Sequence, residues 1–236
     1  EVLFSFTKLA GEADENVSRS VFEPSAAVGE SPTVVLINVS PIEYGHVLLC
    51  PRVTDMLPQQ ISPENLLPAL YMAAESRNPY FRVGYNSLGA YATINHLHFQ
   101  AYYLMEAFPI ERANTVEIFP GTHGDCTVYR VNGYPVRCLC FEVGDSFEEL
   151  ASLVGGCAVK LQGANIPFNI LIADHGARVF LIPQVFSIRI ANNKIPEHVI
   201  DTGVNPAVFE ISGHLLYKQE SDYDQCTETS AEELLA

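Results

Sequence analysis

The sequence predicts an α+β protein in which two similar halves, each with antiparallel strands and a flanking helix, are fused in one chain. Three observations support this prediction. Short β-branched and aromatic runs alternate with polar residues, as in strands that bury one face. Helix start signals occur twice, at Ser62-Pro63 and at Ser146-Phe-Glu-Glu149. In each half, at least one strand precedes the helix signal and two more strands follow it.

The first half is predicted to alternate strands with one helix. The polar, Gly/Ser-containing residues 14–30 indicate a mobile loop. A helix is expected from Ser62 to about residue 76, although Pro68 inside it favours a later start. A turn around residues 41–45 joins two of the strands. Strands are expected at residues 2–6, 33–39, 46–50, 80–85 and from Ile94 onward.

The second half is predicted to repeat this plan without its own polar triplet. Residues 108–133 hold Pro109, Pro120, Gly121 and Gly124 and show little periodicity, which indicates an exposed connection, assigned to residues 113–133. A helix should run from Ser146 to about Gln162, and an acidic tail that ends in a short helix starts at Ser221. Strands are expected at residues 134–143, 168–173 and 178–182. The predicted units are therefore 1–112, 113–133 and 134–236.

The composition excludes some classes of partner. A net charge of −15 argues against a nucleic-acid surface, which requires a basic patch, but not against an anionic nucleotide. No apolar run reaches the ~18 residues of a membrane span. The six cysteines show no zinc or C-x-x-C spacing, so we expect free thiols in the cytoplasm. The chain starts at Glu1 rather than Met, and we expect it to be part of a longer natural chain.

Three polar residues stand two apart in an otherwise apolar and aromatic run: His96, His98 and Gln100. In a strand they would share one face, with the intervening apolar residues on the other. Three interpretations are open: a solvated polar face, a metal site built on two histidines, or nucleophilic catalysis by an imidazole. No H-E-x-x-H or paired C-x-x-C accompanies the histidines.

The residues just before the triplet are small or polar, from Gly84 to Thr93. Gly89 lets the backbone approach a ligand closely, and Asn86, Ser87 and Thr93 offer short hydrogen-bonding groups. A loop of this composition that leads into a histidine-bearing strand is suited to cradling a phosphate.

Two motifs together resemble the histidine-triad superfamily. They are N-x-x-G-A-x-A-T-x-x-H-x-H-x-Q, which begins at Asn86, and P-x-x-x-G-H-x-L-L-x-P from Pro41 to Pro51. The Gln at the third position is typical of the transferase branch, which includes the hexose-1-phosphate uridylyltransferases. The sequence of residues 33–112 resembles the plant-type GDP-L-galactose phosphorylases of ascorbate synthesis. Residues 133–218 show the same resemblance with fewer matching positions. The resemblance implies two fused histidine-triad-like halves.

The resemblance also implies a reaction, in which GDP-L-galactose and phosphate give L-galactose 1-phosphate and GDP through a guanylyl-histidine. His98 would be the nucleophile. His96 would orient the neighbouring backbone or contact phosphate, and Gln100 would donate an amide hydrogen bond to the reacting phosphate. An amide cannot protonate a leaving group, but a sugar phosphate already leaves as an anion. Gln100 therefore suits transfer to phosphate better than hydrolysis.

The residues expected to bind the substrate are Asn86, Ser87, Gly89, Thr93, Arg52 and Glu210. The resemblance implies ribose or phosphate contacts for residues 84–93 (the cradle loop) and sugar-hydroxyl contacts for Glu210. Arg52 would guide the phosphate acceptor. His46 is expected to be structural. Neither a cofactor nor a metal is expected, because the zinc ligands of some transferase-branch members are missing.

The expected partners are a GDP-hexose, inorganic phosphate and GDP, with no nucleic acid and no membrane, and a homodimer fits the resemblance. Two alternatives stay open: a GDP-D-glucose phosphorylase with the same mechanism, and a catalytically weak nucleotide-binding module.

Overall fold

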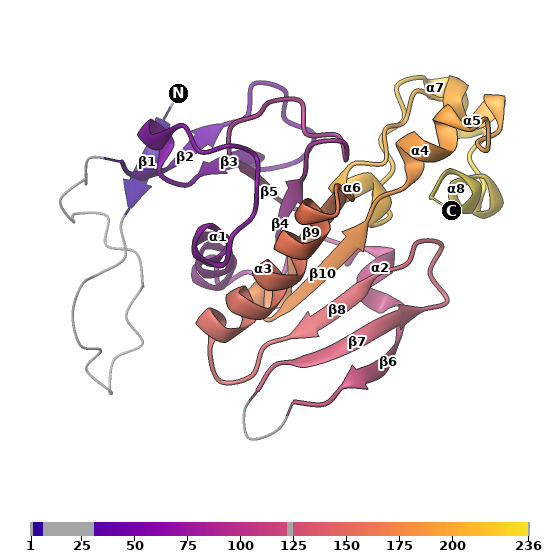
Figure 1. The fold of residues 1–236 in the computed structure, drawn as a ribbon. Coiled ribbons are helices and arrows are strands. Elements are labelled where there is room, and N and C mark those ends of the chain that lie inside the picture. The colour runs from indigo at the N-terminus through magenta and orange to yellow at the C-terminus, as the bar shows by residue number, and fades with distance from the viewer. Residues whose placement is uncertain (1, 7–30, 122–124, 236) are drawn as a thin grey trace, which may run out of the picture.

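The computed structural model describes residues 2–6, 31–121 and 125–235, and its strands form one ten-stranded antiparallel sheet (Figure 1). The strand order is β1-β2-β3-β5-β4-β9-β10-β8-β7-β6. The strands are β1 Val2–Phe6, β2 Thr33–Ile37, β3 Val47–Cys50, β4 Phe81–Asn86, β5 Phe99–Tyr103, β6 Asn114–Phe119, β7 Thr127–Asn132, β8 Leu139–Glu142, β9 Phe168–Ala173 and β10 Arg178–Pro183. The α-helices are α1 Pro63–Glu75, α2 Pro109–Arg112, α3 Phe147–Gly163, α4 Phe186–Ala191, α5 Glu197–Asp201, α6 Val208–Ile211, α7 Glu220–Asp224 and α8 Glu228–Leu235.

The two halves of the sheet are related by an approximate twofold axis between β4 and β9. From the outer edge inward, the first half has the order β1-β2-β3-β5-β4, and the second has β6-β7-β8-β10-β9. The long helices correspond as well, since α1 lies between β3 and β4 and α3 between β8 and β9. The fold is therefore two fused copies of one plan, as the resemblance implied, joined at their innermost strands.

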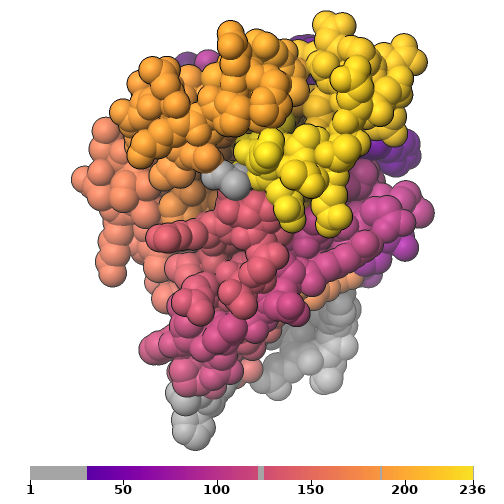
Figure 2. Space-filling model, turned by 90° about the vertical axis from the view of Figure 1, so that its right-hand side faces the viewer, coloured from indigo at the N-terminus to yellow at the C-terminus, as the bar shows by residue number. Residues whose placement is uncertain are grey.

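Helices α1 and α3 lie side by side on one face of the sheet (Figure 1) and enclose the larger core. The opposite face buries a second core under the C-terminal segments, including α6. Figure 2 shows these C-terminal segments gathered above the magenta strands of the second half. Every residue of β4 and β9 is buried, because both faces of the central strands are covered.

Helix α1 begins at Pro63, so the later start favoured by Pro68 is wrong. Ser62 and Asn65 form a capping box: the Ser62 hydroxyl accepts from the Asn65 N–H at 3.3 Å, and the Asn65 side chain accepts from the Ser62 N–H at 2.8 Å. These bonds hold the first turn although Pro68 removes one later backbone hydrogen bond. Ser146 caps α3 similarly by accepting from the Glu149 N–H, as predicted.

Three further sequence-based expectations are wrong. The strand expected at residues 134–143 is the shorter β8, because residues 134–138 are not in a strand. Strand β5 begins at Phe99 rather than at Ile94, because a side chain and not a strand flanks residue 98, as described below. The segment 113–133, expected to be a connection, carries strands β6 and β7. Strand β6 is an edge strand with four exposed residues in succession, so it shows little of the alternation that identifies a strand. The predicted loop at residues 14–30 lies outside the described residues.

A buried ion pair joins the first half to α2. Both Nε and Nη2 of Arg82 donate to the Glu111 carboxylate, at 3.0 and 3.2 Å, and Nη1 donates to the Leu104 carbonyl oxygen at 3.0 Å. The side chains are 3% and 10% exposed, so both charges are largely removed from water.

Replacing Arg82 by Met is expected to lower the free energy of unfolding by about 3 kcal/mol, because Glu111 would keep a buried charge without its partner. Chemical denaturation at neutral pH measures this. The control is Arg112→Met, which removes the exposed pair with Glu106 and should change stability by less than about 1 kcal/mol. Equal losses in the two variants would contradict the account of the buried pair.

Within the described residues, no helix is long and apolar enough to cross a membrane.

Candidate functional site

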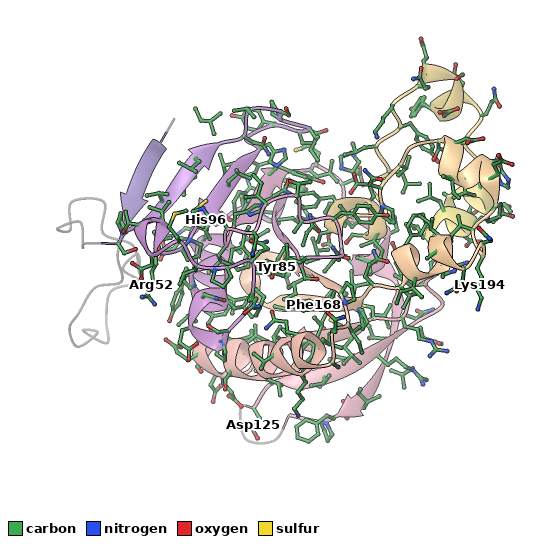
Figure 3. All side chains as sticks on the ribbon, turned by 45° about the horizontal axis from the view of Figure 1, so that its top comes forward. Arg52, Tyr85, His96, Asp125, Phe168 and Lys194 are labelled. Atoms are coloured by element: carbon green, nitrogen blue, oxygen red, sulfur yellow. The ribbon has the colours of Figure 1, made fainter. Side chains whose placement is uncertain are left out.

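The polar triplet lies where β5 begins. Leu97, Phe99 and Ala101 point into the core under α1 and α3, as the alternation predicts. His98 and Gln100 therefore belong to the opposite face, the face on which Tyr102 packs against the C-terminal segments. In Figure 3 the labelled Tyr85 and Phe168 lie in the interior of the domain, and Arg52 and Lys194 lie at its outside.

The ring of His98 is held in one tautomer by its own chain. Its Nδ1 lies 2.8 Å from the carbonyl oxygen of His96. A carbonyl oxygen only accepts, so Nδ1 carries the proton and Nε2 keeps its lone pair. Burial lowers the pKa of His98, outweighing the bond to His96, which raises it. A neutral imidazole with a free Nε2 is the form required of a nucleophile.

The amide of Gln100 is oriented by His46. The backbone N–H of Ile42 donates to Nδ1 of His46 at 3.1 Å, so the proton of this ring is on Nε2. That Nε2 lies 3.0 Å from Oε1 of Gln100 and donates to it. The Asn38 amide nitrogen is also 3.0 Å from Nε2, but as a donor it cannot receive the proton. With its oxygen committed to His46, Gln100 has its NH₂ group available as a donor. His46 is thus a buried residue that orients the side-chain amide of Gln100.

His96 carries a polar atom without a protein partner. Its Nε2 is buried, and no atom of the described residues hydrogen-bonds to it. A buried polar atom of this kind is normally satisfied by a protein group, water or a ligand. An oxygen of a bound phosphate group could satisfy it.

The cradle loop divides into buried and exposed residues. Asn86 is 4% exposed, and its Oδ1 accepts from Nδ2 of Asn169 at 2.7 Å and from the Val208 N–H at 2.9 Å. The hydroxyl oxygen of Ser87 accepts from the Phe168 N–H at 2.8 Å. Gly89 and Thr93 are exposed, and Gly89 has the positive φ of 79° that favours glycine. Asn86 and Ser87 thus tie the loop to the second half.

Arg52 and Glu210 occupy contrasting environments. Arg52 follows β3, and its side chain, 64% exposed, pairs with Asp55. Glu210 lies on α6, which packs against β4 and β9 on the face of Gln100. Burial raises the pKa of Glu210 to about 7, and its charge helps to raise the pKa of Tyr91 to about 12, after burial as the main cause.

Glu210→Gln is expected to stabilise the protein above pH 7. The folded-state pKa of about 7 exceeds the usual 4.5, so the carboxyl reduces stability as pH rises from about 4.5 to 7. The glutamine variant lacks this titration, and its advantage above pH 7 should be on the order of 3 kcal/mol. Denaturant unfolding of both proteins between pH 4.5 and 8 measures it, and a difference that does not change with pH would contradict the buried carboxyl.

Sequence reasoning missed three buried amides next to these residues: Gln59, Asn169 and Gln184. The amide of Gln59 holds the backbone at His98. Asn169 binds Asn86, and Gln184 donates to the carbonyl oxygen of Pro206, which precedes α6. Asn169 could have been found, because it is the one polar residue in the buried strand FNILIA. Gln59 lies in a Pro-rich loop without periodicity, where no signal distinguishes it from its neighbour Gln60.

The second half has apolar or charged residues where the first half has the triplet. Strands β5 and β10 correspond, and Phe180 takes the position of Gln100, with Arg178 at the position of His98. The residues opposite them on the neighbouring strands show this. Gln100 lies opposite Leu48 on β3 and Gly84 on β4. Phe180 lies opposite Cys140 on β8 and Leu171 on β9, the strands that correspond to β3 and β4. Phe180 is fully buried, so this half has no equivalent polar site.

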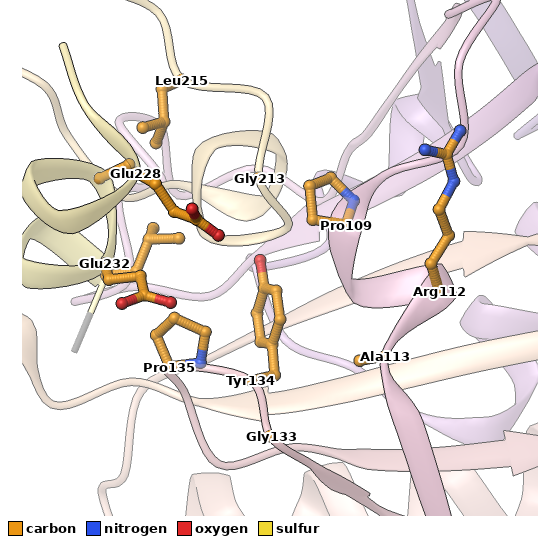
Figure 4. Close-up of a pocket in the computed structure, with 12 residues that line it drawn as sticks. Pro109, Arg112, Ala113, Gly133, Tyr134, Pro135, Gly213, Leu215, Glu228 and Glu232 are labelled. Carbon is orange, nitrogen blue, oxygen red and sulfur yellow. The ribbon is translucent and has the colours of Figure 1, made fainter.

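A separate pocket of about 440 Å³ lies between α2, the β7–β8 turn and α8 (Figure 4). Glu228 and Glu232 of α8 and Tyr134 line it, and none of the predicted site residues does. Arg112 also lines this pocket, so its charged lining is two carboxylates and one guanidinium.

Comparisons with known proteins match both halves to domains of one family. Residues 1–102 match the model of the GDPGP1-like N-terminal domain, and residues 109–236 match that of the GDPGP1-like C-terminal domain. The chain is 52% identical to GDP-L-galactose phosphorylase 1 of Arabidopsis thaliana, over 100% of this chain and 52% of that protein. It is 32% identical to GDP-D-glucose phosphorylase 1 of Homo sapiens, over 99% of this chain and 62% of that protein. The chain thus spans about half the length of the two Arabidopsis thaliana relatives that it matches, GDP-L-galactose phosphorylases 1 and 2.

Among solved structures, the chain resembles the yeast Ap4A phosphorylase Apa2 in complex with Ap4A. The TM-score is 0.64 at 15% identity, over 86% of this chain and 72% of that one. At this identity the likeness concerns the fold.

Proposed function

Because the chain belongs to the GDPGP1-like family, we propose that it carries the catalytic site of a GDP-hexose phosphorylase, with GDP-L-galactose as substrate. The tautomer of His98 carries the proposal. A carbonyl oxygen holds the proton on Nδ1, so Nε2 is available to attack phosphorus at neutral pH.

The reaction proceeds in two displacements. In the first, Nε2 of His98 forms a bond to the α-phosphorus, and the bond from that phosphorus to the bridging oxygen breaks. L-Galactose 1-phosphate leaves with the bridging oxygen and its electron pair. In the second, an oxygen of inorganic phosphate attacks the same phosphorus, GDP forms, and His98 is released. Because the hexose phosphate leaves as an anion, the first step needs no general acid.

Two residues near His98 are suited to stabilising the negative charge that develops on the phosphoryl oxygens. The NH₂ group of Gln100, turned away from His46, would donate to a phosphoryl oxygen in the transition state. The unpartnered Nε2 of His96 would meet another oxygen of the substrate. Gly89 and Thr93 would contact the ribose or phosphates from the cradle loop, with Asn86 and Ser87 behind them. Glu210 would bind sugar hydroxyls, and Arg52 would guide the incoming phosphate.

The choice of sugar rests on similarity. Identity to the plant GDP-L-galactose phosphorylase is 52%, against 32% to the human GDP-D-glucose phosphorylase. Six free cysteines support a cytoplasmic location, where thiols stay reduced.

The test is a phosphorolysis assay that compares GDP-L-galactose with GDP-D-glucose at equal concentrations. Phosphate-dependent release of GDP, with a higher kcat/KM for GDP-L-galactose, supports the proposal. A higher value for GDP-D-glucose would assign the alternative substrate. Tight GDP binding without turnover of either sugar would make the chain a binding module and overturn the proposal.

A further inference from the structure

The side chain of Gln59 replaces a strand neighbour at His98. The described strand pairings of β5 end at Gln100 on the β4 side and at Phe99 on the β3 side, yet the backbone of His98 is hydrogen-bonded on both of its groups. The His98 N–H donates to Oε1 of Gln59 at 2.9 Å, and Nε2 of Gln59 donates to the His98 carbonyl oxygen at 3.1 Å. One amide thus occupies the N–H and the C=O of one residue, as a paired strand would.

The same amide connects His98 to the end of β4. Nε2 of Gln59 also donates to the carbonyl oxygen of Asn86, at 2.8 Å. Asn86 ends β4 and His98 directly precedes β5, so Gln59 fastens the two ends of the segment between these strands to each other. Gln59 is 2% exposed, and no water competes for these bonds.

Gln59 is itself held in place from both sides. Its N–H donates to Oδ1 of Asn95 at 2.9 Å, and its carbonyl oxygen accepts from the Tyr85 hydroxyl at 2.9 Å. Two residues earlier, the carbonyl oxygen of Leu57 accepts from the Leu97 N–H at 2.8 Å. The segment from Leu57 to Gln59 therefore runs alongside residues 95–98 as a rigid support.

We propose that Gln59 is a positioning residue that sets the orientation of the His98 ring through the backbone of residues 96–98. The link is short. Gln59 holds the backbone N–H and carbonyl groups of His98, and the ring of His98 hydrogen-bonds to the carbonyl oxygen of His96, two residues earlier. If this backbone shifts, the carbonyl oxygen that accepts from Nδ1–H moves. The ring then rotates, and Nε2 no longer points at the phosphorus atom. A displacement of about 1 Å at a nucleophile lowers its rate about 10²-fold. The inference rests on the proposed function only for its kinetic consequence.

The test compares Gln59→Met and Gln59→Glu with two matched controls. Methionine keeps the shape and removes all three bonds. Glutamate keeps an acceptor for the His98 N–H but cannot donate to the two carbonyl oxygens. Gln60→Met changes an exposed neighbour. Gln162→Met removes a similar clamp, because the Gln162 amide accepts from the Ile61 N–H at 2.6 Å and donates to the Ile61 carbonyl oxygen at 3.0 Å.

Two readouts are used. The first is the rate at which the histidine adduct forms with saturating GDP-L-galactose, measured by rapid quench and corrected for the folded fraction. It should fall about 10²-fold in both Gln59 variants, with the dissociation constant for GDP changed less than about threefold. Both controls should stay within about threefold of the wild type, Gln162→Met despite a comparable loss of stability.

The second readout is the ¹⁵N NMR spectrum of the His98 ring without substrate. The wild type should show Nδ1 protonated and Nε2 unprotonated, and Gln59→Met should show a mixture of the two tautomers. An unchanged tautomer in Gln59→Met, or equal loss of adduct rate in Gln162→Met, would overturn the role of Gln59. If the wild type forms no adduct, the proposed reaction fails, and the NMR comparison still decides whether Gln59 orients the ring.

Discussion

His98→Ala is expected to lower the rate of phosphorolysis of GDP-L-galactose by at least about 10⁴-fold, because it removes the atom that attacks phosphorus. Gln100 cannot substitute, because the lone pair of its amide nitrogen is delocalised into the carbonyl group. Stopped assays of GDP release at saturating phosphate measure the loss. Binding of GDP should change little, because the imidazole contributes to the reaction and not to recognition of the base.

The matched control is His198→Ala, which removes an exposed imidazole that pairs with Glu233 on the far C-terminal segment. It should retain the wild-type rate. The pH dependence gives a second check, because the pKa of His98 is lowered by burial. The rate limited by the adduct step should therefore stay constant as pH falls through 6.5 and decline only at more acidic pH. A His98→Ala protein within about tenfold of the wild-type rate would refute the assigned nucleophile.

Gln100→Glu is expected to lower the turnover number by about 10²- to 10³-fold. The glutamate keeps an oxygen that accepts from Nε2 of His46, so the packing of the strand is preserved. It replaces the NH₂ donor by a second carboxylate oxygen, which repels the phosphoryl oxygens instead of stabilising their charge. The loss should appear in kcat more than in KM, because the donated bond strengthens as charge develops.

Gln60→Glu is the control for charge alone, since it introduces the same carboxylate at an exposed position. It should stay within about threefold of the wild type. Equal losses in Gln60→Glu and Gln100→Glu would mean that the negative charge acts at long range, and would contradict the role of the amide donor.

The sequence predicted those parts of the fold that carry local signals. The capping residues Ser62 and Ser146 identified α1 and α3, and the alternation around Phe99 identified which residues face the core. The strand repeat also indicated two halves. Strand β6 escaped detection because an edge strand with exposed residues does not alternate.

The site was predictable only as far as its motif. The spacing singled out His98 and Gln100 as residues of one face, and the resemblance to the histidine-triad superfamily implied their roles, but the groups that orient them are far away in the chain. His46 reaches Gln100 across 54 positions, and Gln59 reaches His98 across 39. These contacts form only once β3 lies beside β5 and the loop before α1 lies beside residues 95–98. A buried amide leaves no periodic pattern, so Gln59 could not be distinguished from the exposed Gln60.

The two halves share one plan but differ at the position of the candidate site. Phe180 and Cys140 complete the apolar core where Gln100 and Leu48 stand in the first half. The second half instead supplies support, since Asn169 and the Phe168 backbone fasten the cradle loop. The fused arrangement thus places the half with the candidate site next to a half of the same strand order.

The central claim is that His98 becomes covalently guanylylated, and intact-protein mass spectrometry tests it most directly. The protein is mixed briefly with GDP-L-galactose without phosphate and then quenched. The account predicts a mass gain of one GMP that is acid-labile, disappears on addition of phosphate with release of GDP, and is absent in His98→Ala. Phosphate-dependent release of GDP with no adduct at any mixing time, or an adduct that persists in His98→Ala, would contradict it.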